Sequence, residues 1–161
     1  MTSMDPSHKS PLILPFLGYA ALHVMLELAY FSVPGVVAMY KKNVAAVTNK
    51  TSVNDVIFRM VPYGVLAYAA LFVAVWEFLI KDIVCMRATG RRVDLSPDGD
   101  TLKTVVRRAT VLALAVYGIF NFTNAATLGR AYSLEVVVMD TAWGVGAFNL
   151  LALTALVWAA R

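Results

Sequence analysis

The chain has 161 residues, of which 60% are hydrophobic and 15% are charged, and its mean hydropathy is +0.69. Ordinary soluble domains are nearer ~45–50% apolar and ~25% charged, so the composition excludes that class and indicates a membrane protein. The net charge of +4 comes from dispersed basic residues, most of which flank apolar runs, and this argues against nucleic acid as a partner.

Four apolar runs follow one another along the chain, at about 11–33, 60–80, 109–129 and 137–160. About 20 residues at a rise of about 1.5 Å each cross a hydrocarbon core of roughly 30 Å. Backbone inside lipid must satisfy its own hydrogen bonds, so runs of this length are helices. We therefore predict an all-α fold, with residues 1–161 forming one integral membrane domain. Its four transmembrane helices form an antiparallel bundle.

The connections between the runs carry turn and capping signals. Gly129-Arg130-Ala131-Tyr132 predicts a tight hairpin between the third and fourth helices. Ser96-Pro97-Asp98-Gly99-Asp100 predicts a turn, after which Asp100 or Thr101 caps a third helix that extends below the bilayer. Ser52 and Asp55 have the spacing of a capping box ahead of the second helix.

An even number of spans places both termini on one side of the membrane, called here the near side. Nine basic residues belong to that side: Lys9, Lys81, Arg87, Arg91, Arg92, Lys103, Arg107, Arg108 and Arg161. Five belong to the far side: Lys41, Lys42, Lys50, Arg59 and Arg130. The excess predicts that both termini face the cytoplasm or its organellar equivalent. The identity of the membrane stays open, with an organellar inner membrane or a viral membrane favoured.

Lys103, Arg107 and Arg108 fall just before the third apolar run. At that depth they lie among lipid headgroups, which suggests a contact with anionic lipid. A plain positive-inside anchor is the commoner explanation of the same residues.

Polar side chains recur inside the predicted spans, where each ionisable group needs a partner or a purpose. His23 and Glu27 are four residues apart on the first helix, so they share one stripe. Helical rise places Glu27 and Asn121 at similar depths, roughly 9–10 Å from the far-side ends of their helices. The hairpin sets Asn121 opposite Asp140. These placements predict one intramembrane polar cluster: His23, Glu27, Asn121, Thr123, Asn124 and Asp140.

Two interpretations of the cluster stay open. Its members hydrogen-bond the helices to one another, or Glu27 and His23 relay a proton or an ion. For Asp140 we predict a partner on the third helix, Asn124 or Asn121. A competing count, in which 141–160 alone crosses the core, leaves Asp140 at the interface.

Other residues near the ends of the runs are assigned simpler roles. Glu77 and Lys81, four residues apart, are predicted to form an ion pair. Four aromatic residues are predicted to be interfacial anchors: Tyr63, Trp76, Tyr132 and Trp158.

Catalytic and cofactor motifs are missing from the sequence. It has no phosphate-binding Gly-Lys-Ser/Thr loop, no G-x-S-x-G and no paired histidines at zinc spacing. The single cysteine, Cys85, excludes an internal disulfide and a cysteine-based metal cage. We therefore expect no enzymatic activity, no cofactor and no metal.

Residues 117–144 resemble a known family. YGIFNFTNAATL begins at Tyr117 and DTAWG at Asp140. They are similar to the Y-D-L-T-N-x-A-T-L and D-x-A-W-G pattern of small four-helix membrane proteins, a family of unassigned function in bacteria, some eukaryotes and large DNA viruses. The matching residues are Thr123, Asn124, Ala126, Thr127, Leu128, Asp140, Ala142, Trp143 and Gly144. Asn121 stands where the family has an acid, and Glu27 and Tyr30 match its first helix more loosely. The resemblance implies a fold and assigns no activity.

We expect a small scaffold or accessory subunit of a larger membrane assembly, of the respiratory-complex or viral membrane-capsid type. Its expected partners are membrane lipids and other membrane protein subunits. The alternative is a small proton- or ion-coupled transporter or channel that works through Glu27, His23 and Asp140.

Overall fold

The computed structural model describes residues 13–48, 65–90, 95–96, 99–129 and 132–161, and its elements are all helices. No strand occurs in these ranges, which confirms the all-α prediction. The first two helices are α1 (Ile13–Ser32) and α2 (Pro34–Thr48). The next helix begins at residue 65 and continues through η2 (Trp76–Ile80) into α4 (Lys81–Ala88). After it come α5 (Asp100–Ala113), which continues through η3 (Leu114–Gly118) into α6 (Ile119–Leu128), and finally α7 (Leu134–Ala160). η2 and η3 are single π-helical turns inside longer helices, with backbone bonds that span one residue more than in an α-helix.

Three helices are long and apolar enough to cross a membrane: Ile13–Ser32, Asp100–Leu128 and Leu134–Ala160. They correspond to the first, third and fourth predicted spans. The second predicted span begins at 60–64, outside the described residues, and its described part, 65–80, is helical. The fourth crossing therefore stays a prediction.

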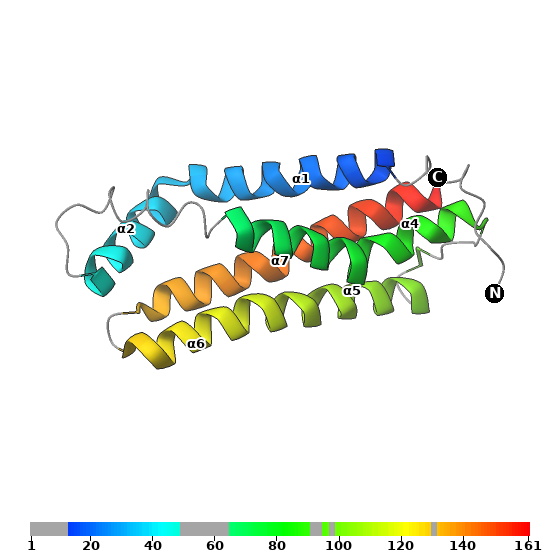
Figure 1. Cartoon of the computed structure of the whole chain (residues 1–161). Coiled ribbons are helices and arrows are strands. Elements are labelled where there is room, and N and C mark those ends of the chain that lie inside the picture. Colours follow the sequence, from blue (N-terminus) through cyan, green and yellow to red (C-terminus); the bar gives the residue numbers. More distant parts are fainter. Residues whose placement is uncertain (1–12, 49–64, 91–94, 97–98, 130–131) are drawn as a thin grey trace.

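α7 forms the centre of the bundle and contacts α1, α2, α4, α5 and α6. The start of α1 and the end of α7 lie at the same end of the bundle (Figure 1). α6 and α7 lie side by side at the other end. Gly129 has a φ of 58°, a conformation that favours glycine, and its carbonyl accepts a bond from the Tyr132 amide at 3.1 Å. Residues 130–131 of the predicted hairpin lie outside the described residues.

α2 is a helix that the sequence analysis did not assign. Pro34 opens it at a position where the missing N–H needs no partner. Val36, Met39 and Asn43 recur at helical spacing and are buried, and they form the face that packs on the bundle. The Asn43 side chain accepts a bond from the Ser133 amide at 2.8 Å, which fixes α2 to the start of α7.

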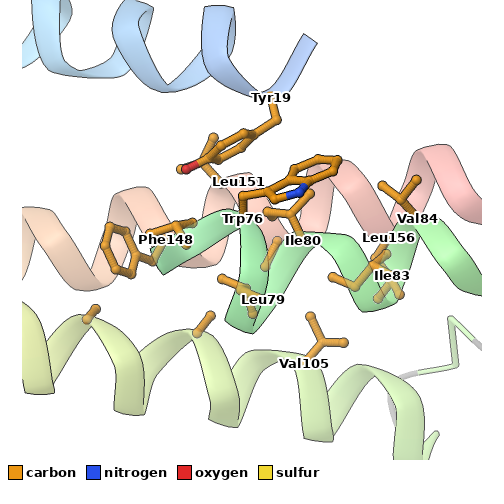
Figure 2. Packing of buried hydrophobic residues seen from close by; sticks show 14 of the residues in the cluster. Tyr19, Trp76, Leu79, Ile80, Ile83, Val84, Val105, Phe148, Leu151 and Leu156 are labelled. Atoms are coloured by element: carbon orange, nitrogen blue, oxygen red, sulfur yellow. The ribbon is translucent and has the colours of Figure 1, made fainter. Parts of the chain in front are cut away.

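The apolar core lies between α1, α4, α5 and α7 (Figure 2). Trp76 is part of it, with only 8% of its surface exposed, and its ring meets Phe16 edge-on at 5.0 Å. The prediction of Trp76 as an interfacial anchor is therefore wrong. The helix continues for twelve residues beyond Trp76, to Ala88, which is about 18 Å, so this tryptophan lies in the body of the helix.

α5 begins at Asp100, as expected, but the expected cap is wrong. The N-cap residue is Gly99, which has no side chain to cap the helix. Gly99 instead closes the preceding turn, because its amide donates to the Ser96 carbonyl at 2.9 Å. The predicted capping box at Ser52 and Asp55 lies outside the described residues.

Candidate functional site

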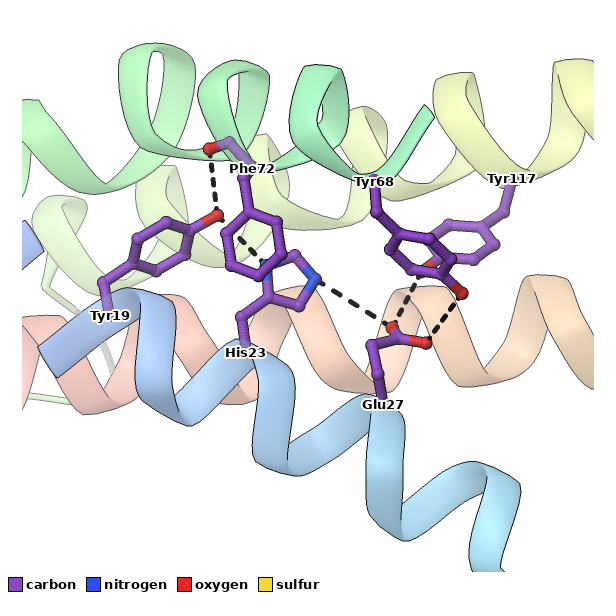
Figure 3. Close-up of polar contacts among 6 residues, drawn as sticks. All are labelled: Tyr19, His23, Glu27, Tyr68, Phe72 and Tyr117. Atoms are coloured by element: carbon purple, nitrogen blue, oxygen red, sulfur yellow. Dashed lines mark hydrogen bonds and ion pairs between the residues drawn. The ribbon is translucent and has the colours of Figure 1, made fainter. Parts of the chain in front are cut away.

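A stripe of polar side chains on α1 faces the interior of the bundle (Figure 3). The Tyr19 hydroxyl donates to the Phe72 carbonyl at 3.1 Å and lies 3.1 Å from His23 Nδ1. A hydroxyl has one hydrogen to donate, and Phe72 takes it. His23 Nδ1 therefore carries the ring proton and donates it to Tyr19, which leaves Nε2 as the bare nitrogen of the neutral imidazole.

His23 Nε2 is buried and has no hydrogen-bond partner in the described part of the chain. The side chain is 0% exposed, and Nε2 lies 3.9 Å from Glu27 Oε1. That separation is too long for a hydrogen bond, although it suits an ion pair. A proton on Nε2 would therefore create an attraction to Glu27 that the neutral ring does not have.

The Glu27 carboxyl group joins α1 to two other helices. The Tyr68 hydroxyl donates to Oε2 at 3.1 Å, and the Tyr117 hydroxyl donates to Oε1 at 3.3 Å. Figure 3 shows both rings pointing at this carboxyl group.

Tyr117 reaches Glu27 because Gly144 lets its ring pass close to α7. A Cβ atom placed on Gly144 would overlap Tyr117 Cδ2, and would lie 2.5 Å from Cε2 and Cγ. Tyr117 itself belongs to the π-helical turn η3. Because Gly144 has no side chain, the Tyr117 ring can occupy the position from which its hydroxyl donates to Glu27.

Asp140 lies in a second polar group, on the side toward α2. The Tyr40 hydroxyl donates to Oδ1 at 2.6 Å, and Asn121 Nδ2 donates to Oδ2 at 2.9 Å. The predicted partnership of Asp140 with Asn121 is therefore confirmed. Asp140 is only 8% exposed. α7 begins six residues before it, at Leu134, so Asp140 lies within the helix and not at its end.

The surroundings of Asp140 keep its neighbours in their donor forms. Burial, and next to it the charge of Asp140, raise the pKa of Tyr40 well above its ordinary value, so its hydroxyl stays protonated. Tyr132, which was predicted to be an interfacial anchor, donates instead to Asn121 Oδ1 at 2.7 Å. Tyr132 thereby orients the amide that holds Asp140.

Stacked rings lie between the Glu27 and Asp140 groups. Tyr30, one turn after Glu27, stacks on Trp143, one turn after Asp140, with ring centroids 4.8 Å apart. Tyr30 Oη and Trp143 Nε1 are buried without a hydrogen-bond partner in the described ranges. We call the whole arrangement the polar seam, made of Tyr19, His23, Glu27, Tyr30, Tyr40, Tyr68, Tyr117, Asn121, Tyr132, Asp140 and Trp143.

The residues predicted to form one cluster lie in two groups, one around Glu27 and one around Asp140, and not all of them are buried. Asn121 bonds Asp140, whereas Asn124 is half-buried and the Thr123 side chain is exposed. Tyr40 and Tyr68 hold the two acids, and the sequence analysis did not select either. A tyrosine within an apolar helix gives no signal beyond its position on a buried face.

The charged residues toward the near side are mostly exposed. Glu77 and Lys81 form the predicted ion pair at 2.7 Å. Lys103, Arg107 and Arg108 are exposed on α5, and Arg108 pairs with Asp82 at 3.3 Å. Among the residues that the structure describes, no three His, Cys, Asp or Glu side chains are arranged to hold a metal ion.

Comparisons with family models, curated proteins and solved structures gave no match to this chain. The family resemblance over residues 117–144 therefore stays a prediction. Several of its motif residues belong to the seam or shape it. Asp140 and Trp143 are members, and Gly144 makes room for the ring of Tyr117.

Proposed function

We propose that this chain is a four-span membrane protein that acts as a non-catalytic scaffold or accessory subunit of a larger membrane assembly. The observation that supports this is the use of its intramembrane acids. Glu27 accepts bonds from two helices other than its own, and Asp140 does the same. Such bonds hold helices together in membranes.

The outer surface of the bundle supports partners within the membrane. Leu14, Leu17, Met25 and Leu28 are between 57% and 78% exposed on α1. In a membrane this face contacts lipid tails or the helices of neighbouring subunits. We infer that both termini face the cytoplasm or its organellar equivalent, and that the partners are lipids and other membrane proteins.

Purification under mild conditions tests the scaffold proposal. The tagged full chain, extracted in a mild detergent, is expected to migrate on a native gel with other membrane proteins in fixed stoichiometry. Mass spectrometry of that band identifies them. Recovery of the chain alone, or only with copies of itself, would count against a scaffold role.

A second candidate function is proton-coupled transport, and the unpartnered Nε2 of His23 favours it. This atom faces Glu27 Oε1 across 3.9 Å, and Tyr30 Oη and Trp143 Nε1 are further buried polar atoms without a described partner. Unsatisfied buried polar groups often mark functional sites. In this alternative a proton taken up by His23 Nε2 passes to Glu27, and the Tyr117 and Tyr68 hydroxyls stabilise the carboxylate that remains after release.

A further inference from the structure

A groove opens where α1, α4 and α7 meet, at the end of the bundle that holds the start of α1 and the end of α7 (Figure 1). Its volume is about 390 Å³. Four of its lining residues, Tyr19, Ile80, Val84 and Leu151, are buried and belong to the apolar core (Figure 2). Trp158, which is 41% exposed, forms part of its rim.

The groove suits an apolar occupant. The Tyr19 hydroxyl is already engaged with Phe72 and His23, so the floor offers hydrocarbon contact. The volume of about 390 Å³ falls within the ~300–1,000 Å³ typical of small-molecule sites. On α7 the lining runs from Leu151 to Trp158, about 10 Å of helix. A partner transmembrane helix would need a face of roughly 30 Å, so the groove is too short for one.

A positive charge lies beside Trp158, one of the residues that line the groove. The Arg87 guanidinium lies 4.4 Å from the centroid of the Trp158 ring, and Arg87 Nη1 donates to the Trp158 carbonyl at 2.6 Å. A guanidinium has five N–H donors, and the exposed Arg87 uses one of them in this bond. Guanidinium groups suit phosphate oxygens in charge and geometry.

We propose that the groove binds an acyl chain of an anionic phospholipid, with the phosphate of its headgroup on Arg87. A tryptophan beside an arginine at a helix end is the usual arrangement at headgroup depth. The charge of Arg87 selects the anionic headgroup and the apolar floor holds the chain. This site is separate from Lys103, Arg107 and Arg108, which lie on α5. It rests on the membrane placement proposed above and is independent of any host complex.

Two matched pairs of variants test the two parts of the site. Gly18 lines the groove, and a Cβ atom there meets nothing within 4 Å, so Gly18→Leu adds side-chain volume to the lining from a position with free space at Cβ. Gly146→Leu is its control, since Gly146 on α7 has the same free space and lies outside the groove. Arg87→Gln removes the charge beside Trp158, and Lys42→Gln is the control for an exposed basic residue on α2, at the other end of the bundle.

Native mass spectrometry of the delipidated full chain in detergent measures binding. The probes are phosphatidylglycerol and phosphatidylcholine with identical acyl chains. The wild type is expected to prefer phosphatidylglycerol about five-fold, the effect of one basic residue near the headgroups. Arg87→Gln should abolish the preference, and Gly18→Leu should reduce binding of both lipids. Both controls should match the wild type.

Several results would overturn the proposal. Equal retention by Gly18→Leu and Gly146→Leu would show that lipid does not occupy the groove. A preference that survives Arg87→Gln, or is lost in Lys42→Gln, would place the headgroup elsewhere. A photo-reactive side chain at Thr154, on the same rim, should cross-link lipid in native membranes. Its capture of a polypeptide instead would identify a protein occupant. Because the binding assay contains no host complex, its failure is distinct from failure of the scaffold proposal.

Discussion

Single atoms decide the geometry of the polar seam. Tyr117 reaches Glu27 only because Gly144 has no side chain, and the tautomer of His23 follows from the one hydrogen of the Tyr19 hydroxyl. Each of these residues acts on Glu27 from a different helix or a different turn. Small substitutions are therefore expected to have specific effects here.

Gly144→Ala is expected to destabilise the protein by about 1–3 kcal/mol, the usual cost of overpacking a core. The new methyl group must displace the Tyr117 ring, and this also breaks the bond from Tyr117 to Glu27. Gly146→Ala, two residues along the same helix in free space, should instead gain up to about 1 kcal/mol. Unfolding in mixed micelles measures both changes. Equal effects of the two substitutions would contradict the close approach of Tyr117.

Glu27→Gln separates the scaffold from the transporter. Glutamine keeps the size of the side chain and one acceptor oxygen while it removes a half-buried acidic group that needs partners. We expect the native complex to be recovered in full and its stability to be unchanged or slightly higher. We also expect no specific proton flux into liposomes from either protein.

The flux measurement decides between the scaffold and the transporter. Flux in the wild type that disappears in Glu27→Gln, with the complex intact, would overturn the scaffold choice and support relay through Glu27 and His23. Glu77→Gln serves as the control, since it removes an exposed carboxyl group that pairs with Lys81 and lies outside the polar seam.

At the scale of elements, α2 is held to the bundle by few polar contacts. Tyr40 bonds to Asp140 on α7, and Asn43 accepts from the Ser133 amide at the N-cap of the same helix. The buried face of α2 adds Val36 and Met39. Asp140 thereby couples α2, α6 and α7 through one carboxylate.

A double-mutant cycle between Tyr40→Phe and Asp140→Asn measures this coupling. Hydrogen bonds between membrane helices average about 0.6 kcal/mol and reach about 1.7 kcal/mol, so a coupling energy in that range is expected for unfolding in micelles. Tyr30→Phe is the control, because the Tyr30 hydroxyl has no partner in the described residues. Its coupling with Asp140→Asn should be smaller. A coupling near zero for Tyr40 would mean that its bond to Asp140 does not stabilise the docking of α2, which then depends on Asn43 and the apolar contacts.

At the scale of the whole molecule, the arrangement of helix ends agrees with an even number of crossings. The start of α1, the end of α7 and the end of α4 lie together at one end of the bundle (Figure 1). α2, the end of α6 and the start of α7 lie at the other end. In the sequence the basic residues divide nine to five between the predicted near and far sides, and this excess predicts the orientation in the membrane.

Cysteine labelling tests that topology in a Cys85→Ala background, which removes the single native thiol. Cysteines placed at Gly99 and at Arg161 should react with an impermeant reagent from the same side of sealed vesicles. A cysteine placed at Asn49 should react only from the other side. Labelling of Gly99 and Asn49 from one face would exclude the four-span arrangement.

The sequence alone determined the helical class, the three apolar helices that can span a membrane, and two polar pairs. Asn121–Asp140 and Glu77–Lys81 were accessible because residue counting along helices fixes faces and depths. Residue counting placed Trp76 wrongly at the membrane interface, because its helix continues beyond the end of the apolar run, to Ala88.

Only the tertiary structure decided which side chains satisfy the acids and where the groove lies. The partners Tyr68 and Tyr40 are 41 and 100 positions from Glu27 and Asp140. Hydropathy and helical period specify which face of a helix is buried, but not which helix lies against it. Lateral neighbours follow from close packing, as where Gly144 admits the Tyr117 ring, and such fits depend on shapes that no local pattern contains.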